Sequence, residues 1–225
     1  HSLKKYFEAH FPILKDKILV LPDGADPIDV NNIFGAGVRK EGKLNIGYTG
    51  HLYSGKGMEI ISHLVKSIDS VHFHIVGGTE EDIAYWKNKI GNHSNISFHG
   101  FQPHSKIPCF LKDFDVVLLP NQPEVFGNVK KDIGQWTSPL KLFEYMAAGK
   151  AIICSDLPVL REVVEHENNA LLCPPKDAKG WKIAIERLQR DPEFREKIAQ
   201  NAYNVFFNYS WATRVRGILQ QAFRI

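Results

Sequence analysis

The sequence predicts an α/β fold, a doubly wound and mostly parallel six-stranded Rossmann-like sheet with C-terminal helices. From Leu44 onward, short apolar runs alternate with segments of helical periodicity, which is typical of a parallel sheet wrapped by helices on both faces. The composition agrees with this class, because 44% hydrophobic and 24% charged residues are ordinary for a globular enzyme.

The chain before residue 43 is interpreted separately from the rest. Leucine and aromatic residues recur at roughly helical spacing over residues 2–11, which predicts a helix. The apolar run at residues 18–21 predicts a short strand, and a polar stretch over residues 23–42 reads as a linker. One helix and one strand cannot form a core. Residues 1–42 are therefore expected to be the remnant of an N-terminal domain plus a linker, and residues 43–225 the main domain.

The elements of the main domain follow from its apolar runs and their periodicity. Strands are predicted at residues 44–48, 72–76, 96–98, 116–119, 151–153 and 170–172. Helices are predicted at residues 58–67, 80–90, 105–112, 139–148, 158–166, 178–189, 192–207 and 211–223. In such a sheet, ligands bind at the carboxyl ends of the strands. The loops expected there are 49–57, 77–80, 99–104, 120–138 and 154–158.

One predicted helix start has the pattern of an anion site. Ser138 is a favoured N-cap, and Pro139 suits the first helical position. The backbone N–H groups of Leu140 and Lys141 would then point out of the positive end of the helix, where phosphate binds. Glu144 follows, where its carboxylate would accept hydrogen bonds from two vicinal hydroxyls. Phosphate and diol together outline a sugar nucleotide; the alternative is an ordinary capped helix that leads into a core strand.

A glycine-rich loop follows the first strand of the main domain. Glycines between Gly50 and Gly57 allow the backbone to approach a ligand closely, and Lys56 precedes the next helix. The spacing is that of neither a Walker loop nor a dinucleotide fingerprint. Beside the helix start at the same sheet edge, the loop predicts the second half of a diphosphate site; alone, it is equally a glycine turn with a solvated lysine. His51 is interpreted either as a hydrogen-bond donor to a phosphate or developing anion, or as a solvent-facing imidazole.

Two further features were weighed as sites. The connection over residues 120–137 exceeds the usual loop length, which often indicates a functional loop, and it contains Glu124, either a site residue or a surface charge. His72 and His74 alternate along one strand and so face the same side of it. We predict that these histidines pack there rather than bind a metal.

Composition limits the partners and the compartment. The formal net charge is only +3 with dispersed basic residues, which argues against a nucleic-acid partner and leaves a peripheral membrane association open. The three cysteines fit neither a disulfide framework nor a metal site, so a cytoplasmic location with reduced thiols is expected, at the inner face of the membrane if the association occurs. No apolar run approaches the roughly 18 residues of a membrane span.

These motifs resemble the donor-binding domain of retaining glycosyltransferases with the GT-B fold, in particular glycosyltransferase family four. The resemblance runs from about Leu44 to the C-terminus. It is sharpest in the sequences SPLKLFEYMAAGK at residues 138–150 and SDLP at residues 155–158. The loop at residues 50–57 is similar to the family's Gly-Arg-x4-Lys-Gly loop, and residues 98–100 to its Phe-x-Gly strand end. Residues 18–26 resemble the segment that closes the family's N-terminal domain.

The resemblance implies a hexosyltransferase of polysaccharide biosynthesis. It would transfer a sugar, with retention of configuration, from a UDP- or GDP-sugar to a saccharide or lipid-linked acceptor. The chain would be the donor-binding half, inactive without its N-terminal domain, which the resemblance implies to be the acceptor domain. No metal or other cofactor is expected, because cations and a helix dipole neutralise the diphosphate. The implied catalytic residues are Lys56 and Glu124. The implied donor-binding residues are Gly50, His51, Lys56, Phe101, Thr137, Ser138, Leu140, Lys141 and Glu144.

Two positions depart from the family pattern. His51 replaces the loop arginine and lacks its bidentate fork. The family's first glutamate, separated by seven residues from the second, would fall on Trp136 when counted back from Glu144. Either Glu124 is that glutamate, displaced by an insertion, or the first glutamate is absent. A GT-B-fold epimerase of sugar nucleotides and a non-catalytic nucleotide- or phosphate-binding module therefore stay open as alternatives.

Overall fold

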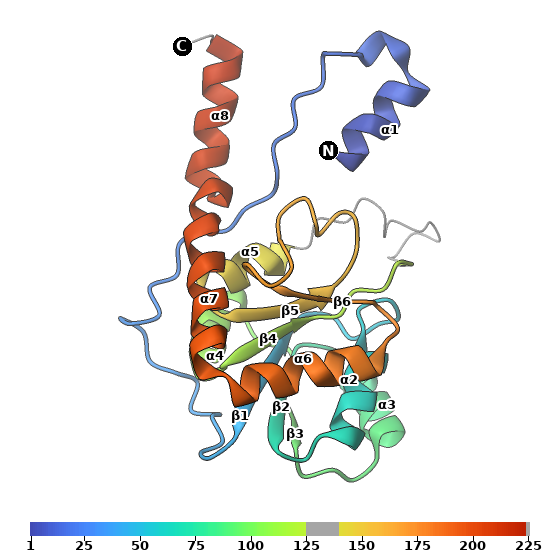
Figure 1. Ribbon diagram of the computed structural model, residues 1–225, viewed down its shortest axis with the longest axis vertical. Helices are drawn as coiled ribbons and strands as arrows, with labels where there is room; N and C mark the ends of the chain where they lie inside the picture. The colour runs from blue at the N-terminus through green and yellow to red at the C-terminus, as the bar shows by residue number, and fades with distance from the viewer. Residues whose placement is uncertain (125–139, 224–225) are drawn as a thin grey trace.

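The computed structural model describes residues 1–124 and 140–223, and a six-stranded parallel sheet forms the centre of the described chain (Figure 1). The strand order is β3-β2-β1-β4-β5-β6, and each neighbouring pair is parallel. This confirms the predicted doubly wound α/β class. The strands are β1 (Leu44–Thr49), β2 (Val71–Val76), β3 (Ile96–Phe98), β4 (Val116–Leu119), β5 (Ala151–Ser155) and β6 (Leu171–Cys173).

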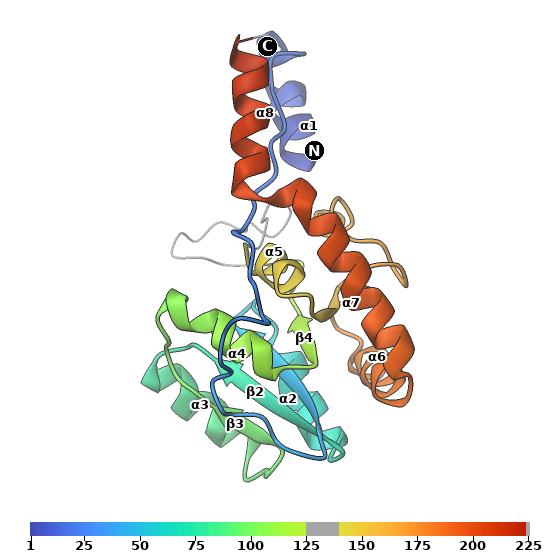
Figure 2. The same ribbon diagram turned by 90° about the vertical axis from the view of Figure 1, so that its left-hand side faces the viewer.

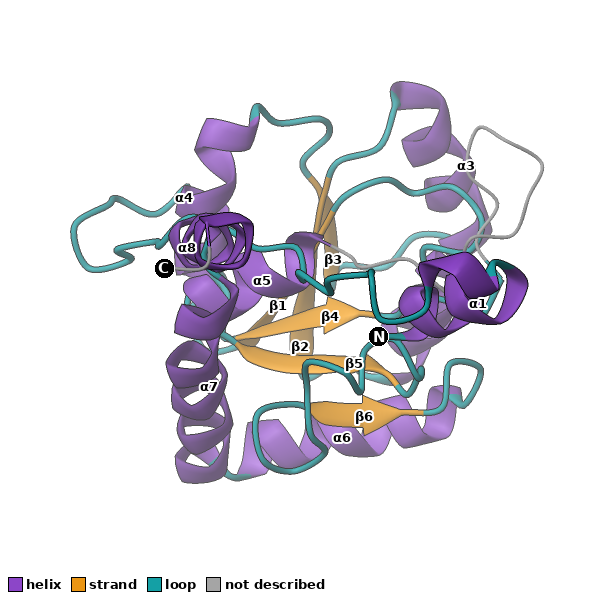
Figure 3. Ribbon diagram, turned by 90° about the horizontal axis from the view of Figure 1, so that it is seen from above, coloured by secondary structure: helices purple, strands orange, loops and turns teal. Residues whose placement is uncertain are grey.

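Helices cover both faces of the sheet (Figure 3). Successive side chains of β4 enter two different cores, Val116 and Leu118 on one face and Val117 and Leu119 on the other. Burial on both faces explains why the strands are continuous apolar runs in the sequence. The first core contains side chains of α2 (Met58–Ser67), α3 (Glu80–Ile90) and α6 (Ala178–Arg190). The second contains side chains of α4 (Ile107–Asp113), α5 (Leu140–Ala147) and α7 (Pro192–Phe206).

Local capping sets several helix starts. The Thr79 hydroxyl accepts a hydrogen bond from the Asp82 N–H, and the Asp82 carboxylate accepts one from the Thr79 N–H, so α3 begins with a capping box. The Asp177 and Asp191 carboxylates cap α6 and α7 by accepting hydrogen bonds from the Gly180 and Phe194 N–H groups. These signals are local in the sequence. The predicted bounds of α2 and α3 are accordingly confirmed to the residue.

The two ends of the chain lie beyond one end of the sheet (Figures 1 and 2). They form α1 (Ser2–His10), the 3-10 turn η1 (Pro12–Leu14) and α8 (Trp211–Phe223), the last with the predicted bounds. Between them, residues 25–38 run along the main domain. Ala25 is buried in the second core and pairs with the α7–α8 turn through backbone bonds to Tyr209 and Trp211. The predicted boundary near residue 42 stays a prediction.

Two predicted elements are wrong. Residues 18–21 form no strand, because no neighbouring strand pairs with them among the described residues; Leu21 instead packs beside Gly217 of α8. Residues 158–166 form successive turns rather than a helix, with bonds such as Leu160 N–H to Leu157 O and Val164 N–H to Leu160 O. The turns bury Leu160 and Val164, and this burial produced the helical periodicity.

Candidate functional site

The centre of the sheet contains the point at which the strand order reverses. The chain runs outward from β1 through β2 to β3, then crosses to β4 on the other side of β1. The loops after β1 and β4 therefore diverge, and α5 lies beyond the end of β4 (Figure 2). In open parallel sheets this reversal forms the ligand crevice.

The floor of this edge is made of backbone. The Gly50 N–H donates to Val76 O at 2.8 Å, and the Gly77 N–H donates to Gly100 O at 2.7 Å, which joins the ends of β1, β2 and β3. Gly77 has a φ of 122°, and a Cβ added there would lie 2.1 Å from Gly50 O. Only glycine fits this contact.

Lys141 lies at the root of the loop that follows β1. Its Nζ donates to Thr49 O at 3.2 Å and sits 4.0 Å from the centre of the Tyr48 ring. Burial and, after it, the charge of Lys56 lower the pKa of Lys141 to about 7, and Glu144 opposes the shift. Lys56 and Glu144 therefore lie within electrostatic reach of Lys141.

The loop that carries Lys56 is fixed at both ends. The Tyr48 hydroxyl donates to His51 O at 2.6 Å, and the exposed His51 ring lies tilted beside the Tyr53 ring, 5.4 Å between centroids. At the far end, a Cβ on Gly57 would lie 2.0 Å from Pro120 O, so the loop backbone packs directly on the residue after β4. Lys56 therefore stands between the ends of β1 and β4.

A buried tyrosine connects α5 to β1. The Tyr145 hydroxyl accepts a hydrogen bond from the Thr49 N–H at 3.0 Å and lies 3.1 Å from Thr49 Oγ1. Burial raises the pKa of Tyr145 well above its usual value, so the phenol stays protonated. The sequence analysis did not identify Tyr48 or Tyr145, because an aromatic residue in an apolar run looks like any core residue.

Glu144 faces the connection between β3 and α4. Its Oε1 accepts a hydrogen bond from Nε2 of His104, which begins the 3-10 turn η2 (His104–Lys106), at a distance of 2.8 Å. Glu144 and Leu140 line a cavity of about 340 Å³ together with Ile107 and Trp211. Phe101 lies on the same connection and is 80% exposed, free of the core. The sequence analysis did not identify His104.

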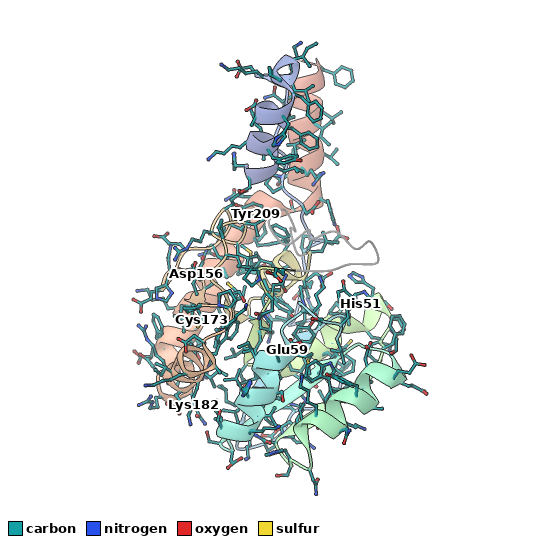
Figure 4. All side chains as sticks on the ribbon, turned by 90° about the vertical axis from the view of Figure 1, so that its right-hand side faces the viewer. His51, Glu59, Asp156, Cys173, Lys182 and Tyr209 are labelled. Atoms are coloured by element: carbon teal, nitrogen blue, oxygen red, sulfur yellow. The ribbon has the colours of Figure 1, made fainter. Side chains whose placement is uncertain are left out.

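The remaining predicted site residues lie elsewhere. Glu124 is exposed and lines a different cavity of about 370 Å³ with Glu59, His63 and Lys176. Thr137 and Ser138 lie outside the described residues, so the predicted N-cap stays a prediction. Figure 4 shows how wide the edge is, with His51 at one side and Asp156 and Cys173 at the other.

The strand histidines pack as predicted. His74 Nε2 lies 2.9 Å from Asn45 Oδ1, His74 Nδ1 lies 3.1 Å from His99 Nε2, and His72 Nε2 lies 2.9 Å from Ser97 Oγ. The Lys40 N–H already donates to Asn45 Oδ1, so His74 Nε2 is a donor to the same oxygen. Within the described residues, no group of three or more His, Cys, Asp or Glu side chains is arranged to hold a metal ion.

Comparison with known proteins identifies the family. The sequence model of the family described as "Glycosyl transferases group 1" matches residues 29–205, well over half of the chain. The chain belongs to this family. Several relatives in the comparison are named as glycosyltransferases, which supports an enzyme that transfers sugars.

Individual relatives agree with the family assignment. An uncharacterised glycosyltransferase of Methanocaldococcus jannaschii is 28% identical over 93% of this chain and 55% of its own length. The crystal structure of a glycosyltransferase from Rickettsia africae superposes with a TM-score of 0.80 at 17% identity, covering 98% of this chain and 60% of that one. Anabaena HepE in complex with UDP and glucose superposes with a TM-score of 0.67 at 19% identity, covering 82% and 49%. These structures show the shared GT-B fold.

The chain spans about half the length of the relatives that it matches. Within the described residues, no helix combines the length and the apolar character that a bilayer crossing requires.

Proposed function

We propose that this chain is the donor-binding half of a retaining glycosyltransferase of family four. It binds a UDP- or GDP-sugar, whose sugar passes to a saccharide or lipid-linked acceptor in polysaccharide biosynthesis. The observation that carries the proposal is the convergence of Lys56 and Lys141 at the root of one glycine loop, at the point where the strand order reverses. Lys56 lowers the pKa of Lys141, and two cations near each other are costly unless an anion neutralises them.

The chemistry proposed for this arrangement is stabilisation of the leaving group. As the glycosidic bond breaks, negative charge grows on the diphosphate, and Lys56, Lys141 and the first N–H groups of α5 neutralise it. His51 adds a donor at the loop. These groups replace a metal ion in the proposal, so no cofactor is required.

In this proposal, the nucleoside binds beside the part of α5 that carries Glu144. The Glu144 carboxylate accepts hydrogen bonds from the ribose hydroxyls, and Phe101 lies on the connection that faces the base. Glu124 is proposed as the sugar-side carboxylate, in the long loop after β4.

The acceptor would bind to the N-terminal half of the enzyme, in the cytoplasm or at the inner face of the membrane, so the chain alone would bind donor without turnover. The comparisons give no support to the epimerase or to the non-catalytic module.

The proposal is tested with Lys56→Ala. The affinity for UDP or GDP, whichever the wild type binds more tightly, is expected to fall by about 10- to 100-fold, since a hydrogen bond to a charged group contributes about 1.5–3 kcal/mol. The affinity for the corresponding nucleoside is expected to stay unchanged, because it carries no phosphate. Isothermal titration calorimetry measures both constants.

The matched control for this charge removal is Lys66→Ala, at the exposed far end of α2. That variant should bind both ligands like the wild type. Equal losses for nucleoside and nucleoside diphosphate in Lys56→Ala would contradict the diphosphate site and remove the main support for the proposed function.

A further inference from the structure

His104 and Glu144 form a contact that joins the turn η2 to helix α5. They are 40 residues apart in the sequence, yet the His104 Nε2 and Glu144 Oε1 atoms lie 2.8 Å apart. The Glu144 side chain is only 20% exposed, whereas the His104 side chain is 83% exposed. A carboxylate can only accept, so Nε2 of His104 is the donor.

Stability does not explain this pair. An ion pair or hydrogen bond with one partner in water contributes little to folding, typically between 0 and about 1 kcal/mol. His104 also lies in a short 3-10 turn and makes no contribution to either core. The contact acts instead on the position of Glu144.

The alternative position of Glu144 is set by α5 itself. Lys141 and Glu144 are three residues apart on one helix and therefore neighbours on its surface, where opposite charges attract. Glu144 already raises the pKa of Lys141, so the carboxylate lies within electrostatic reach of the ammonium. A carboxylate that turned onto Lys141 would neutralise the cation and lose the acceptor. Instead, Lys141 bonds to Thr49 and Glu144 bonds to His104.

We propose that His104 is a positioning residue for Glu144. It holds the carboxylate on the α4 side of the site, open to the ribose hydroxyls and separate from Lys141. This inference rests on the proposed function, because it assigns the ribose to Glu144. Both side chains line the same cavity beside Ile107 and Pro108, which gives the carboxylate an open space to face.

The test compares UDP or GDP, whichever the wild type binds more tightly, with its 2′,3′-dideoxy analogue. The dissociation constant of the dideoxy analogue divided by that of the nucleoside diphosphate measures the part of binding that depends on the ribose hydroxyls. His104→Ala is expected to reduce this ratio at least threefold with the affinity for the dideoxy analogue unchanged. His104→Gln is expected to restore it, because the glutamine Nε2 donor lies near the position of the imidazole Nε2. Titration calorimetry on the full chain gives every constant.

Two controls separate positioning from structure. Ser105→Ala changes an exposed neighbour in the same turn and should leave the ratio as in the wild type. In a Glu144→Gln background, His104→Ala should have no further effect on the ratio, because the two residues act through one carboxylate.

The possible results separate a failure of the positioning role of His104 from a failure of the ribose assignment. If the wild type discriminates against the dideoxy analogue and His104→Ala discriminates equally, or binds the diphosphate more tightly, the inference is overturned and the proposed function stands. If the wild type binds both ligands equally, or neither nucleoside diphosphate binds, the ribose assignment fails and the inference fails with it. A reduced ratio in His104→Ala that His104→Gln restores supports the inference.

Discussion

Lys141 carries a charge that depends on the occupant of the site. Burial and the neighbouring Lys56 bring its pKa to about 7, so near neutral pH a large fraction of the molecules hold a neutral amine. A bound diphosphate would favour the ammonium and raise this pKa. Binding would then require the uptake of a proton by the molecules in which Lys141 is neutral.

The affinity for a nucleoside diphosphate is expected to depend on pH through this proton uptake by Lys141. Below pH 7, Lys141 is already charged and uptake is unnecessary. As the pH rises above about 7, the affinity for a nucleoside diphosphate is expected to fall, by at most about tenfold per pH unit, until the pH reaches the raised pKa of the complex. Titration calorimetry between pH 7 and pH 9 measures this slope.

The matched variant for this prediction is Lys141→Arg. A guanidinium stays charged throughout this range, so the affinity of the variant should be nearly independent of pH above 7. Equal slopes in the wild type and in Lys141→Arg would contradict proton uptake by Lys141.

At the scale of single residues, the sequence identified groups by their charge or backbone character. Lys56, Lys141 and Glu144 were predicted because a cation beside glycines and a carboxylate after a helix start have a recognisable chemistry. Tyr48, Tyr145 and His104 were not, because their roles come from partners that are far away in the sequence: Tyr145 meets Thr49 across 96 positions. Only the folded chain brings such pairs together.

Among the elements, β2 and the residue that follows β3 bring three histidines together, the buried His72 and His74 and the half-buried His99. Burial is the main cause that lowers the pKa of His72 to about 4 and that of His74 to about 3, and burial also lowers the pKa of His99. The nearby cations Lys40, Lys43 and Arg39 contribute to these lowered pKa values in addition to burial. All three imidazoles are therefore neutral in the folded protein at neutral pH.

This histidine group predicts sensitivity to mild acid. An unfolded histidine takes up a proton near pH 6.5, whereas folded His72 and His74 remain neutral down to about pH 4 and pH 3, so the unfolded state binds more protons in this window. The free energy of unfolding should fall as the pH drops below 6.5. The expected loss is about 1 kcal/mol per shifted histidine at one pH unit below 6.5. Urea unfolding at pH 7.5 and pH 5.5 measures it.

His72→Gln tests the source of that slope. Glutamine keeps a polar contact with Ser97 but does not titrate, so the difference between the two pH values should shrink. His63→Gln, at an exposed position on α2, should keep the difference of the wild type. The same slope in His72→Gln and in the wild type would place the acid sensitivity outside this histidine.

The elements also show which patterns are reliable. Runs between clear caps or glycines, such as α2, α3 and β4, were predicted to the residue. Residues 18–21 and 158–166 were not, because an apolar run or a helical period reports only that side chains are buried. A strand additionally needs a neighbouring strand, and a helix needs an unbroken ladder of backbone bonds; neither requirement is visible in a short segment.

On the scale of the whole molecule, the segment before β1 is part of the packing of the main domain. Ile28, Val30, Ala36 and Val38 pack against the second core, and the Val38 N–H donates to Asp113 at 2.9 Å. We expect the cooperative unit to begin near residue 25. Deleting residues 1–20 should change the free energy of unfolding by less than about 1 kcal/mol, whereas deleting residues 1–38 should lower it by on the order of 3 kcal/mol or more.

Urea unfolding monitored by tryptophan fluorescence measures both truncations, and the shorter deletion is the control for the longer one. If the two deletions give the same free energy of unfolding, residues 21–38 do not stabilise the main domain. The predicted boundary near residue 42 would then hold.

The backbone floor beneath the site has a consequence for how the molecule opens. The Gly50 and Gly77 amide protons are each bonded to a carbonyl of the neighbouring strand end rather than to a side chain. Their exchange with solvent therefore requires the ends of β1, β2 and β3 to separate, whatever the side chains above them do. These two amides are built-in reporters of motion in the sheet itself. A ligand that tightens only the overlying side chains would leave their exchange rates unchanged, whereas one that presses the strand ends together would slow both.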